Sequence, residues 1–259
     1  MTMRSLAFRA AYWATSVFFA LTATPLLLAP SRKPLTLWIL LYTRVVTFWM
    51  RVLAGIRIEV RGRENLPAGP CVIAAKHQSW GDGVVMFAQF YDLAFVVGDH
   101  LEKFPLVGGI LRKLGAIIVD NCGGAYARAR RVDAQLVKAR AENRSVLIYP
   151  EGHLSPAGRR HRYRRGVFHI YAAYGCAAAP VATNLGLFWP QASWSLKPGV
   201  AVVEFLPPIP PGLAKEAFMT DLERAIETRT NELVAEADPT ALVRNDPLPD
   251  PAPKRAAQG

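Results

Sequence analysis

The sequence predicts an α/β fold: a mixed sheet of about seven strands flanked by helices, preceded by an N-terminal membrane-associated helical hairpin. Three observations lead to this prediction. Two apolar segments with helical character occupy residues 1–54. Short runs rich in β-branched and aromatic residues then recur along the chain. Helix-prone stretches separate several of these runs, and such alternation is typical of a layered α/β sheet.

The length and composition are those of a protein with a large folded domain. The chain has 259 residues, of which 51% are hydrophobic, enough for one large domain with or without an appendage. The formal net charge of +11 indicates an anionic partner, which can be nucleic acid, a lipid surface or an acidic small substrate. Cys71, Cys122 and Cys176 are far apart and lack metal-ligand spacing. We therefore expect reduced thiols, a cytosol-facing protein and no metal site.

The first apolar segment, residues 10–29, contains no charged side chain. As a helix it would be about 30 Å long, close to the hydrocarbon thickness of a bilayer. Arg4 and Arg9 precede it and Arg32 and Lys33 follow it, so the flanking charges do not set an orientation. A cleaved signal peptide is the alternative, but the segment is longer than the usual apolar region and no A-x-A site lies near its end.

The second segment, residues 35–53, repeats apolar and aromatic side chains at helical spacing: Leu35, Trp38, Ile39, Tyr42, Val45, Trp49 and Val52. Threonines and arginines fall on the other side: Thr36, Thr43, Arg44, Thr47 and Arg51. This pattern suits a helix in the membrane interface with arginines directed to phosphates. Packing against the soluble domain is the alternative. Together the segments predict a hairpin, residues 1–54, that dips into the bilayer or spans it once.

The sequence pattern changes from helical to β-rich after Gly55. Seven short β-rich runs follow along the chain: IRIEVRG, CVIAAKH, LAFVVGD, GAIIVDN, SVLIYPEG, AAAPVATNLG and VAVVEFLPPI. Helix-prone stretches lie near residues 83–91, 124–141 and 166–175. After a Pro-rich break, an amphipathic helix is expected to end near Ala237. The tail is rich in Pro, Asp and Ala and is predicted to be disordered. The expected division is a hairpin at 1–54, one domain at 55–237 and a tail at 238–259.

The stretch KHQSWGD places His77 just beyond a predicted strand and Asp82 five residues later. That spacing is poor for two neighbours on one helix. It works if the histidine lies on a loop and the aspartate opens the next helix, where the carboxylate can cap the helix or reach the imidazole. In the second case the pair has the chemistry of a general base and its orienting carboxylate. A capping aspartate beside an unrelated surface histidine is the alternative.

A second polar cluster follows the strand SVLIYPEG: Glu151, Gly152, His153, Leu154 and Ser155. An arginine-rich stretch comes next and contains Arg159, Arg160, Arg162, Arg164 and Arg165. These guanidinium groups suit phosphate binding near an anionic surface. A solvated loop is one alternative, and a nucleic-acid patch with Tyr163 stacking on a base is another. The membrane-like N-terminus disfavours nucleic acid as a partner.

Four blocks of the sequence resemble the glycerolipid acyltransferases, the family that includes the lysophosphatidic acid acyltransferases. They are ENLPAGPCVIAAKHQSWGD, FPLVGGILRKLGAIIVDN, YPEGHLSPAGRRHRYRRGVFH and APVATN, and they occur in the family's order between about Val60 and Pro208. The resemblance implies that His77 is the general base and that Asp82 orients it. The acceptor oxygen would then attack the thioester of acyl-CoA or acyl carrier protein directly. No acyl-enzyme and no cofactor would be needed.

The same resemblance implies the substrate-binding residues. They are Lys103, Pro105 and Gly108 in the second block, Glu151 and Gly152 in the third, and Pro180 in the fourth. The family usually has Thr-Arg after Glu-Gly, whereas this chain has His153 and Leu154. Leucine cannot pair with phosphate. One of Arg159, Arg160, Arg164 and Arg165 then substitutes for the missing arginine, or the acceptor is a different lysolipid.

The expected function is transfer of an acyl chain to the free hydroxyl of a lysolipid, with 1-acylglycerol 3-phosphate as the leading acceptor and phosphatidic acid as the product of phospholipid biosynthesis. Lyso-ornithine lipid is the alternative acceptor, and a non-catalytic lipid-binding membrane protein is the alternative of another class. The expected partners are membrane lipids, the lysolipid and the thioester donor. The expected location is the cytoplasmic face of a bacterial inner membrane.

Overall fold

The computed structural model describes residues 2–104, 106–119, 125–241, 243, 244 and 246–249. The strands are β1 Ile56–Arg61, β2 Val72–Ala75, β3 Ala94–Gly98, β4 Ile117–Val119, β5 Val146–Ile148, β6 Ala178–Thr183 and β7 Gly199–Phe205. The helices are α1 Met3–Thr22, α2 Lys33–Trp49, α3 Asp82–Phe87, α4 Asp99–Glu102, α5 Val107–Leu114, α6 Ala125–Ala141, α7 Gly166–Tyr174, α8 Leu185–Phe188 and α9 Lys215–Ala237. Short helical turns of other types are η1 Thr24–Leu28, η2 Met50–Ala54 and η3 Arg63–Asn65.

The seven strands form one sheet in the order β1-β7-β6-β2-β5-β3-β4. β6 and β7 pair antiparallel, whereas all other neighbours in the sheet pair parallel. β1 and β7 therefore run opposite to the other five strands. The prediction of a mixed α/β sheet of about seven strands with flanking helices is confirmed, and each of the seven β-rich runs marks the position of one strand.

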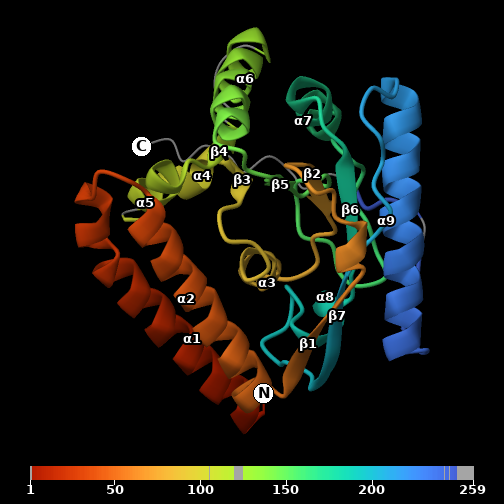
Figure 1. Cartoon of the computed structure of the whole chain (residues 1–259). Helices are drawn as coiled ribbons and strands as arrows, with labels where there is room; N and C mark the ends of the chain where they lie inside the picture. The colour runs from red at the N-terminus through yellow and green to blue at the C-terminus, as the bar shows by residue number, and fades with distance from the viewer. Residues whose placement is uncertain (1, 105, 120–124, 242, 245, 250–259) are drawn as a thin grey trace, which may run out of the picture.

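Helices cover both faces of the sheet (Figure 1). The amphipathic helices α6, α7 and α9 bury their apolar side chains against one face, with Leu136, Ile170 and Leu222 among them. The other face is covered by α3, α8 and the end of the hairpin, through residues such as Val85 and Leu185. A strand buried on both faces needs apolar side chains in both directions. This explains why β2 is continuously apolar, with all four of its residues buried.

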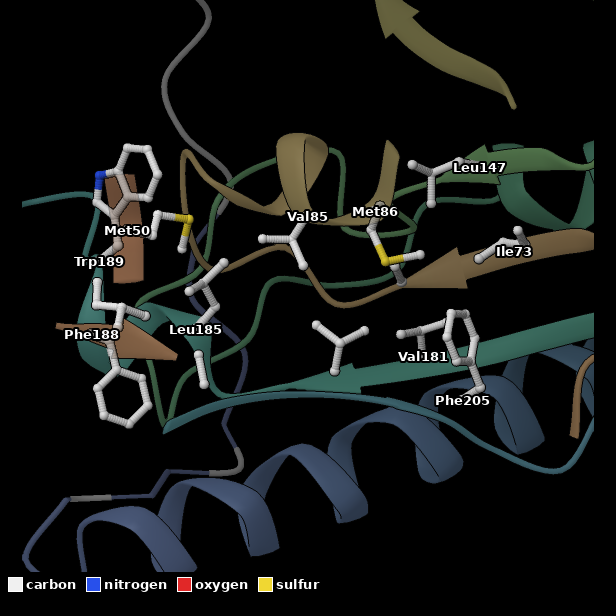
Figure 2. Close-up of a cluster of buried hydrophobic side chains, with 14 of the residues drawn as sticks. Met50, Ile73, Val85, Met86, Leu147, Val181, Leu185, Phe188, Trp189 and Phe205 are labelled. Carbon is white, nitrogen blue, oxygen red and sulfur yellow. The ribbon is translucent and has the colours of Figure 1, made fainter. Parts of the chain in front are cut away.

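Figure 2 shows the core on the hairpin side of the sheet. Trp189 is 2% exposed and is the largest fully buried side chain described. Its ring packs edge-on against Phe8, with centroids 4.9 Å apart, and against Tyr12 at 5.3 Å. Phe8 and Tyr12 belong to α1, so the hairpin contributes side chains to the core of the domain. The hairpin and the sheet are therefore one packed structure.

The hairpin carries an apolar outer surface as well as this packed inner one. Two helical segments, Met3–Leu28 and Lys33–Ala54, are long and apolar enough to cross a bilayer, judged by length and composition alone. Thr36 and Thr43, expected on the polar side of the second segment, are instead buried. Their hydroxyl groups donate to carbonyls of their own helix, which removes the cost of burying them. The exposed side includes Leu37, Leu41, Phe48 and Val52, together with Arg44 and Arg51.

Both ends of the hairpin are tied to the domain. At the start of α1, Arg9 donates two hydrogen bonds of 2.9 Å to the carbonyls of Ser193 and Trp194. At the turn before α2, Arg32 forms ion pairs of 2.8 Å with Asp92 and with Glu142. The hairpin thus lies along the side of the domain rather than projecting from it, as Figure 1 also shows.

The segment after α9 folds back onto the arginine-rich stretch. The backbone N–H of Arg244 donates to the carbonyl of Gly158, and that of Leu248 donates to the carbonyl of Arg160. Residues 250–259 of the predicted disordered tail lie outside the described residues. These two hydrogen bonds place the segment after Asp238 beside the loop that carries the candidate phosphate-binding arginines.

Candidate active site

The loops that follow β2 and β5 form the candidate site. These strands are parallel neighbours, with Val72 paired to Val146, so their carboxyl ends lie at the same edge of the sheet. The chain leaving β2 continues into His77, and the chain leaving β5 continues into Glu151. Ligands of open α/β sheets bind at such edges. The topology therefore explains why two motifs that are 74 residues apart meet.

His77 and Asp82 form a hydrogen-bonded pair. The Nδ1 of His77 lies 2.9 Å from the Oδ2 of Asp82. The same carboxylate oxygen accepts the backbone N–H groups of Gln78 and Ser79 at 2.7 and 2.8 Å. Asp82 opens α3, as expected, but its carboxylate faces the preceding loop and the imidazole instead of capping the helix. Of the two alternatives for this carboxylate, the structure has the one that reaches the imidazole.

This geometry leaves one imidazole nitrogen available for chemistry. Two backbone N–H groups hold the Asp82 carboxylate in place. The carboxylate can only accept a hydrogen bond, so the proton of the neutral imidazole lies on Nδ1 and Nε2 is left to accept a proton. The His77 side chain is 23% exposed, whereas that of Asp82 is 3% exposed. A substrate can therefore reach the histidine but not the aspartate. A base with a shielded orienting carboxylate is the arrangement expected for proton abstraction.

The ring of Tyr149 holds the imidazole from one face. The two rings are stacked, with centroids 4.0 Å apart and an interplanar angle of 16°. Burial raises the pKa of the Tyr149 phenol well above its usual range, and the nearby Asp82 carboxylate acts in the same direction. The phenol therefore stays neutral. Sequence reasoning did not select Tyr149; its position directly before Pro-Glu-Gly was the available signal.

Glu151 joins the two loops. Its Oε1 accepts hydrogen bonds from the Lys76 ammonium at 2.9 Å, from the backbone N–H of His161 at 2.8 Å, and from the Ser155 hydroxyl. Its Oε2 accepts the backbone N–H of His77 at 3.4 Å. Both Lys76 and Glu151 have fully buried side chains. Glu151 is therefore occupied by protein groups and braces the histidine loop.

Arg164 is the candidate arginine that lies beside the Glu-Gly block. Gly152 has a φ of +68°, and a Cβ atom there would lie 3.1 Å from Cδ and Nε of Arg164. The guanidinium of Arg164 is 2.9 Å from Nε2 of His153, so these two side chains form one rim. Arg159 and Arg160 contact acidic groups elsewhere, Asp246 at 3.5 Å and Glu223 respectively. Arg165 is exposed and precedes α7.

The other expected substrate-binding residues are more dispersed. Lys103 is 73% exposed and pairs with Asp99 at 3.3 Å. Gly108 lies in the first turn of α5, and Pro105 lies outside the described residues. Pro180 is buried within β6, opposite Ala74. The structure thus brings together His77, Asp82, Glu151 and the His153–Arg164 rim, whereas Lys103 pairs with Asp99 and Pro180 lies within the sheet.

Known proteins share both the sequence and the fold. A family model described as Acyltransferase matches residues 57–184. A 1-acyl-sn-glycerol-3-phosphate acyltransferase from Pseudomonas aeruginosa is 31% identical over 237 residues, which is 92% of this chain and 90% of that relative. The chain belongs to the acyltransferase family. This confirms the expectation that the protein is an O-acyltransferase of lipid metabolism.

Two further similarities bear on this acyltransferase. A lyso-ornithine lipid O-acyltransferase from Pseudomonas aeruginosa is 25% identical over 142 residues, 54% of each chain. The crystal structure of the 1-acyl-sn-glycerophosphate acyltransferase PlsC from Thermotoga maritima superposes with a TM-score of 0.72 at 20% identity, covering 90% of this chain and 97% of that chain. At this identity the structural match shows a shared fold.

Gly108 has a packing role in the acyltransferase fold that gives a first prediction. A Cβ atom at this position would lie 2.0 Å from the carbonyl oxygen of Glu102, so α4 and α5 can approach each other only with glycine here. We expect Gly108→Ala to lower the free energy of unfolding by about 1–3 kcal/mol through overpacking. Denaturant unfolding measures this. Gly69→Ala, where a Cβ atom meets nothing within 4 Å, is the matched control. Equal stability of both variants would contradict the packing argument.

Proposed function

We propose that this acyltransferase moves an acyl chain from acyl-CoA or acyl carrier protein to the free hydroxyl of 1-acylglycerol 3-phosphate, giving phosphatidic acid. The observation that carries the proposal is the His77–Asp82 pair, with Nε2 available at the carboxyl edge of the sheet. The Pseudomonas aeruginosa relative with this named activity matches nearly the whole chain, which supports the acceptor.

The proposed reaction is a direct transfer. His77 Nε2 takes the proton of the acceptor hydroxyl as its oxygen attacks the thioester carbon. The Asp82 carboxylate stabilises the imidazolium that forms. The C–S bond then breaks, the imidazolium returns its proton to the thiolate, and the products are an ester and a free thiol. Serine nucleophiles are not offered at this site: Ser79 is buried and accepts a hydrogen bond from Gly81, and Ser155 is buried and donates to Glu151.

Arg164 is the arginine that we assign to the acceptor phosphate in place of the family arginine absent at Leu154. Its contact with His153 and its position over Gly152 support this assignment. A charge-assisted hydrogen bond contributes about 1.5–3 kcal/mol, so we expect Arg164→Ala to raise the KM for lysophosphatidic acid about 10- to 100-fold. The KM for the thioester should stay unchanged. Steady-state kinetics with both substrates measures the two values separately.

The control for Arg164 is Arg57→Ala, which removes an exposed guanidinium that pairs with Glu59 on β1. A KM for lysophosphatidic acid that rises equally in both variants would reflect the loss of general positive charge at the surface. An unchanged KM for lysophosphatidic acid in the Arg164→Ala variant would contradict the assignment. Arg165 would then be the next candidate for the phosphate-binding arginine.

The hairpin supports a location on one face of a membrane. Helix α1 is about 30 Å long, so a helix crossing the bilayer would place its ends on opposite sides. Here the start of α1 and the turn before α2 both contact the same domain. We infer that the hairpin lies in one leaflet, with its exposed apolar side chains in the lipid: Leu6, Trp13, Val17, Phe18, Leu21, Leu28, Leu37, Leu41, Phe48 and Val52. Reduced cysteines and an anionic thioester donor favour the cytoplasmic face of a bacterial inner membrane.

A different lysolipid acceptor is the second candidate. Leu154 stands where the family arginine is expected, and a lyso-ornithine lipid acyltransferase is among the relatives. The ornithine headgroup carries less negative charge than a phosphate monoester. Its binding would therefore need fewer guanidinium groups. Arg164 beside the site is the observation that keeps lysophosphatidic acid as the leading acceptor.

The deciding experiment offers membranes containing the protein a labelled acyl-CoA or acyl carrier protein together with one of three acceptors: lysophosphatidic acid, lyso-ornithine lipid or a lysophospholipid with a larger headgroup. Preference for lysophosphatidic acid supports the proposal. Preference for lyso-ornithine lipid supports the second candidate. Consumption of thioester with any acceptor, if it depends on His77, would eliminate the alternative of a non-catalytic lipid-binding protein.

A further inference from the structure

A buried ionic network surrounds Lys76, the residue that directly precedes His77. The ammonium of Lys76 contacts Glu151 Oε1 at 2.9 Å, Glu227 Oε1 and Oε2 at 2.8 and 3.0 Å, and the carbonyl of Arg159 at 3.1 Å. All three protons of the ammonium therefore have acceptors. Lys76 is 1% exposed. Glu227 comes from α9, a helix that lies outside the matched family region of residues 57–184.

The charges in this network do not balance. Lys76 supplies one positive charge, whereas Glu151 and Glu227 supply two carboxylates. Burial raises the pKa of Glu227, and the Lys76 ammonium opposes this shift. Tyr163 adds a hydrogen bond of 2.8 Å to Glu227 Oε1, and its phenol stays neutral because burial and Glu227 raise its pKa. Removing Glu227 would leave Lys76 and Glu151 as a balanced pair, so charge balance alone does not require this carboxylate.

The position of Glu227 gives it another role. Lys76 directly precedes His77, and Glu151 accepts the backbone N–H of His77 as well as that of His161. The ammonium that fixes Glu151 is held from its other side by Glu227. Helix α9 is therefore connected to the two loops of the active site by a chain of hydrogen bonds between buried groups.

We propose that Glu227 is a positioning residue for the acyl transfer reaction: through Lys76 and Glu151, helix α9 holds the His77 loop and the loop of residues 151–161 in their active arrangement. This inference rests on the proposed function. It adds a residue that touches neither substrate, and it gives α9 a part in catalysis. Displacement of a catalytic group by about 1 Å can cost on the order of 100-fold in rate.

The experiment compares Glu227→Ala, Glu227→Gln and the control Glu216→Ala, which alters an exposed carboxylate in the first turn of the same helix. In Glu227→Ala we expect kcat to fall about 10- to 100-fold while both KM values change less than about twofold. Glu227→Gln keeps the side-chain length and one acceptor for Lys76, and it should recover most of the lost activity. Glu216→Ala should match the wild type.

Amide hydrogen exchange gives a readout that does not depend on activity. In Glu227→Ala, exchange should become faster in peptides covering residues 76–82 and 150–161, and it should stay unchanged in β3 and β4. A lower Tm with an unchanged kcat and unchanged exchange in those two loops would overturn the inference, because Glu227 would then be only structural. If the wild type transfers no acyl group, the proposed function fails, and the exchange data alone still decide whether α9 positions the loops.

Discussion

Replacing His77 by alanine is expected to lower kcat for acyl transfer by about 10²- to 10⁴-fold, the usual contribution of a general base. The physical reason is that Nε2 of His77 is the acceptor left at the sheet edge once Nδ1 is bound to Asp82. The KM values should change little, because in the proposed reaction the imidazole meets the acceptor only at its reacting hydroxyl. Release of free thiol from an acyl-CoA in the presence of lysophosphatidic acid measures kcat directly.

The chain offers a matched control for this variant. His169 on α7 also pairs with a carboxylate, that of Asp133 at 2.8 Å, but both side chains are more than 40% exposed. His169→Ala should have wild-type activity, because an exposed pair contributes little to stability. Full turnover in His77→Ala would refute the proposed mechanism. A loss of membrane association or of cooperative unfolding would show instead that the substitution disturbs the fold.

The Asp82→Asn substitution is expected to have the second largest effect, again about 10²- to 10⁴-fold on kcat, as in other enzymes with a histidine base and a buried aspartate. One oxygen of Asp82 accepts three N–H groups: the Nδ1–H of His77 and the backbone N–H groups of Gln78 and Ser79. An amide that presents its oxygen there loses the charge that stabilises the imidazolium. An amide that presents its NH₂ group meets three donors.

Asp133→Asn is the control for this substitution, because it makes the same chemical change beside the exposed His169. It should leave kcat unchanged. Activity of Asp82→Asn within about threefold of the wild type would mean that the carboxylate only shapes the loop, since charge and tautomer control would then contribute less than about 1 kcal/mol.

Much of the fold could be predicted because its signals are local. Most strands are short apolar runs bounded by polar or turn residues, whereas β1 alternates apolar and charged side chains. β2 and β5 are fully buried, as continuous apolar runs require. The strand order has no local signal: β7 lies between β1 and β6, which the sequence pattern does not indicate. The burial of Thr36 and Thr43 was missed because a hydroxyl bonded to its own helix can be buried at low cost.

In the site too, contacts between residues close in the sequence could be predicted, and contacts between distant residues could not. His77 and Asp82 are five residues apart, so a loop and a helix start suffice to join them. The spacing left a capping aspartate as an alternative, and the family resemblance implied the pairing. Lys76 and Glu227 are 151 residues apart, and nothing in the composition of α9 distinguishes Glu227 from its other carboxylates. Tyr149 depends on the packing of two loops. The catalytic roles of His77 and Asp82, and the substrate-binding roles of the remaining residues, stay predictions until the variants are measured.

The placement of β1 also bears on how the protein is made. β1 is at the edge of the sheet and pairs with β7. Its partner emerges from the ribosome about 140 residues later, which at about 5–20 residues per second takes roughly 7–28 s. During that time the hairpin, synthesised first, can already reach a membrane while β1 still waits for its neighbour. With the proposed membrane location, β1 would stay unpaired beside the lipid surface until β7 is made, and an unpaired edge strand is prone to pair with other chains.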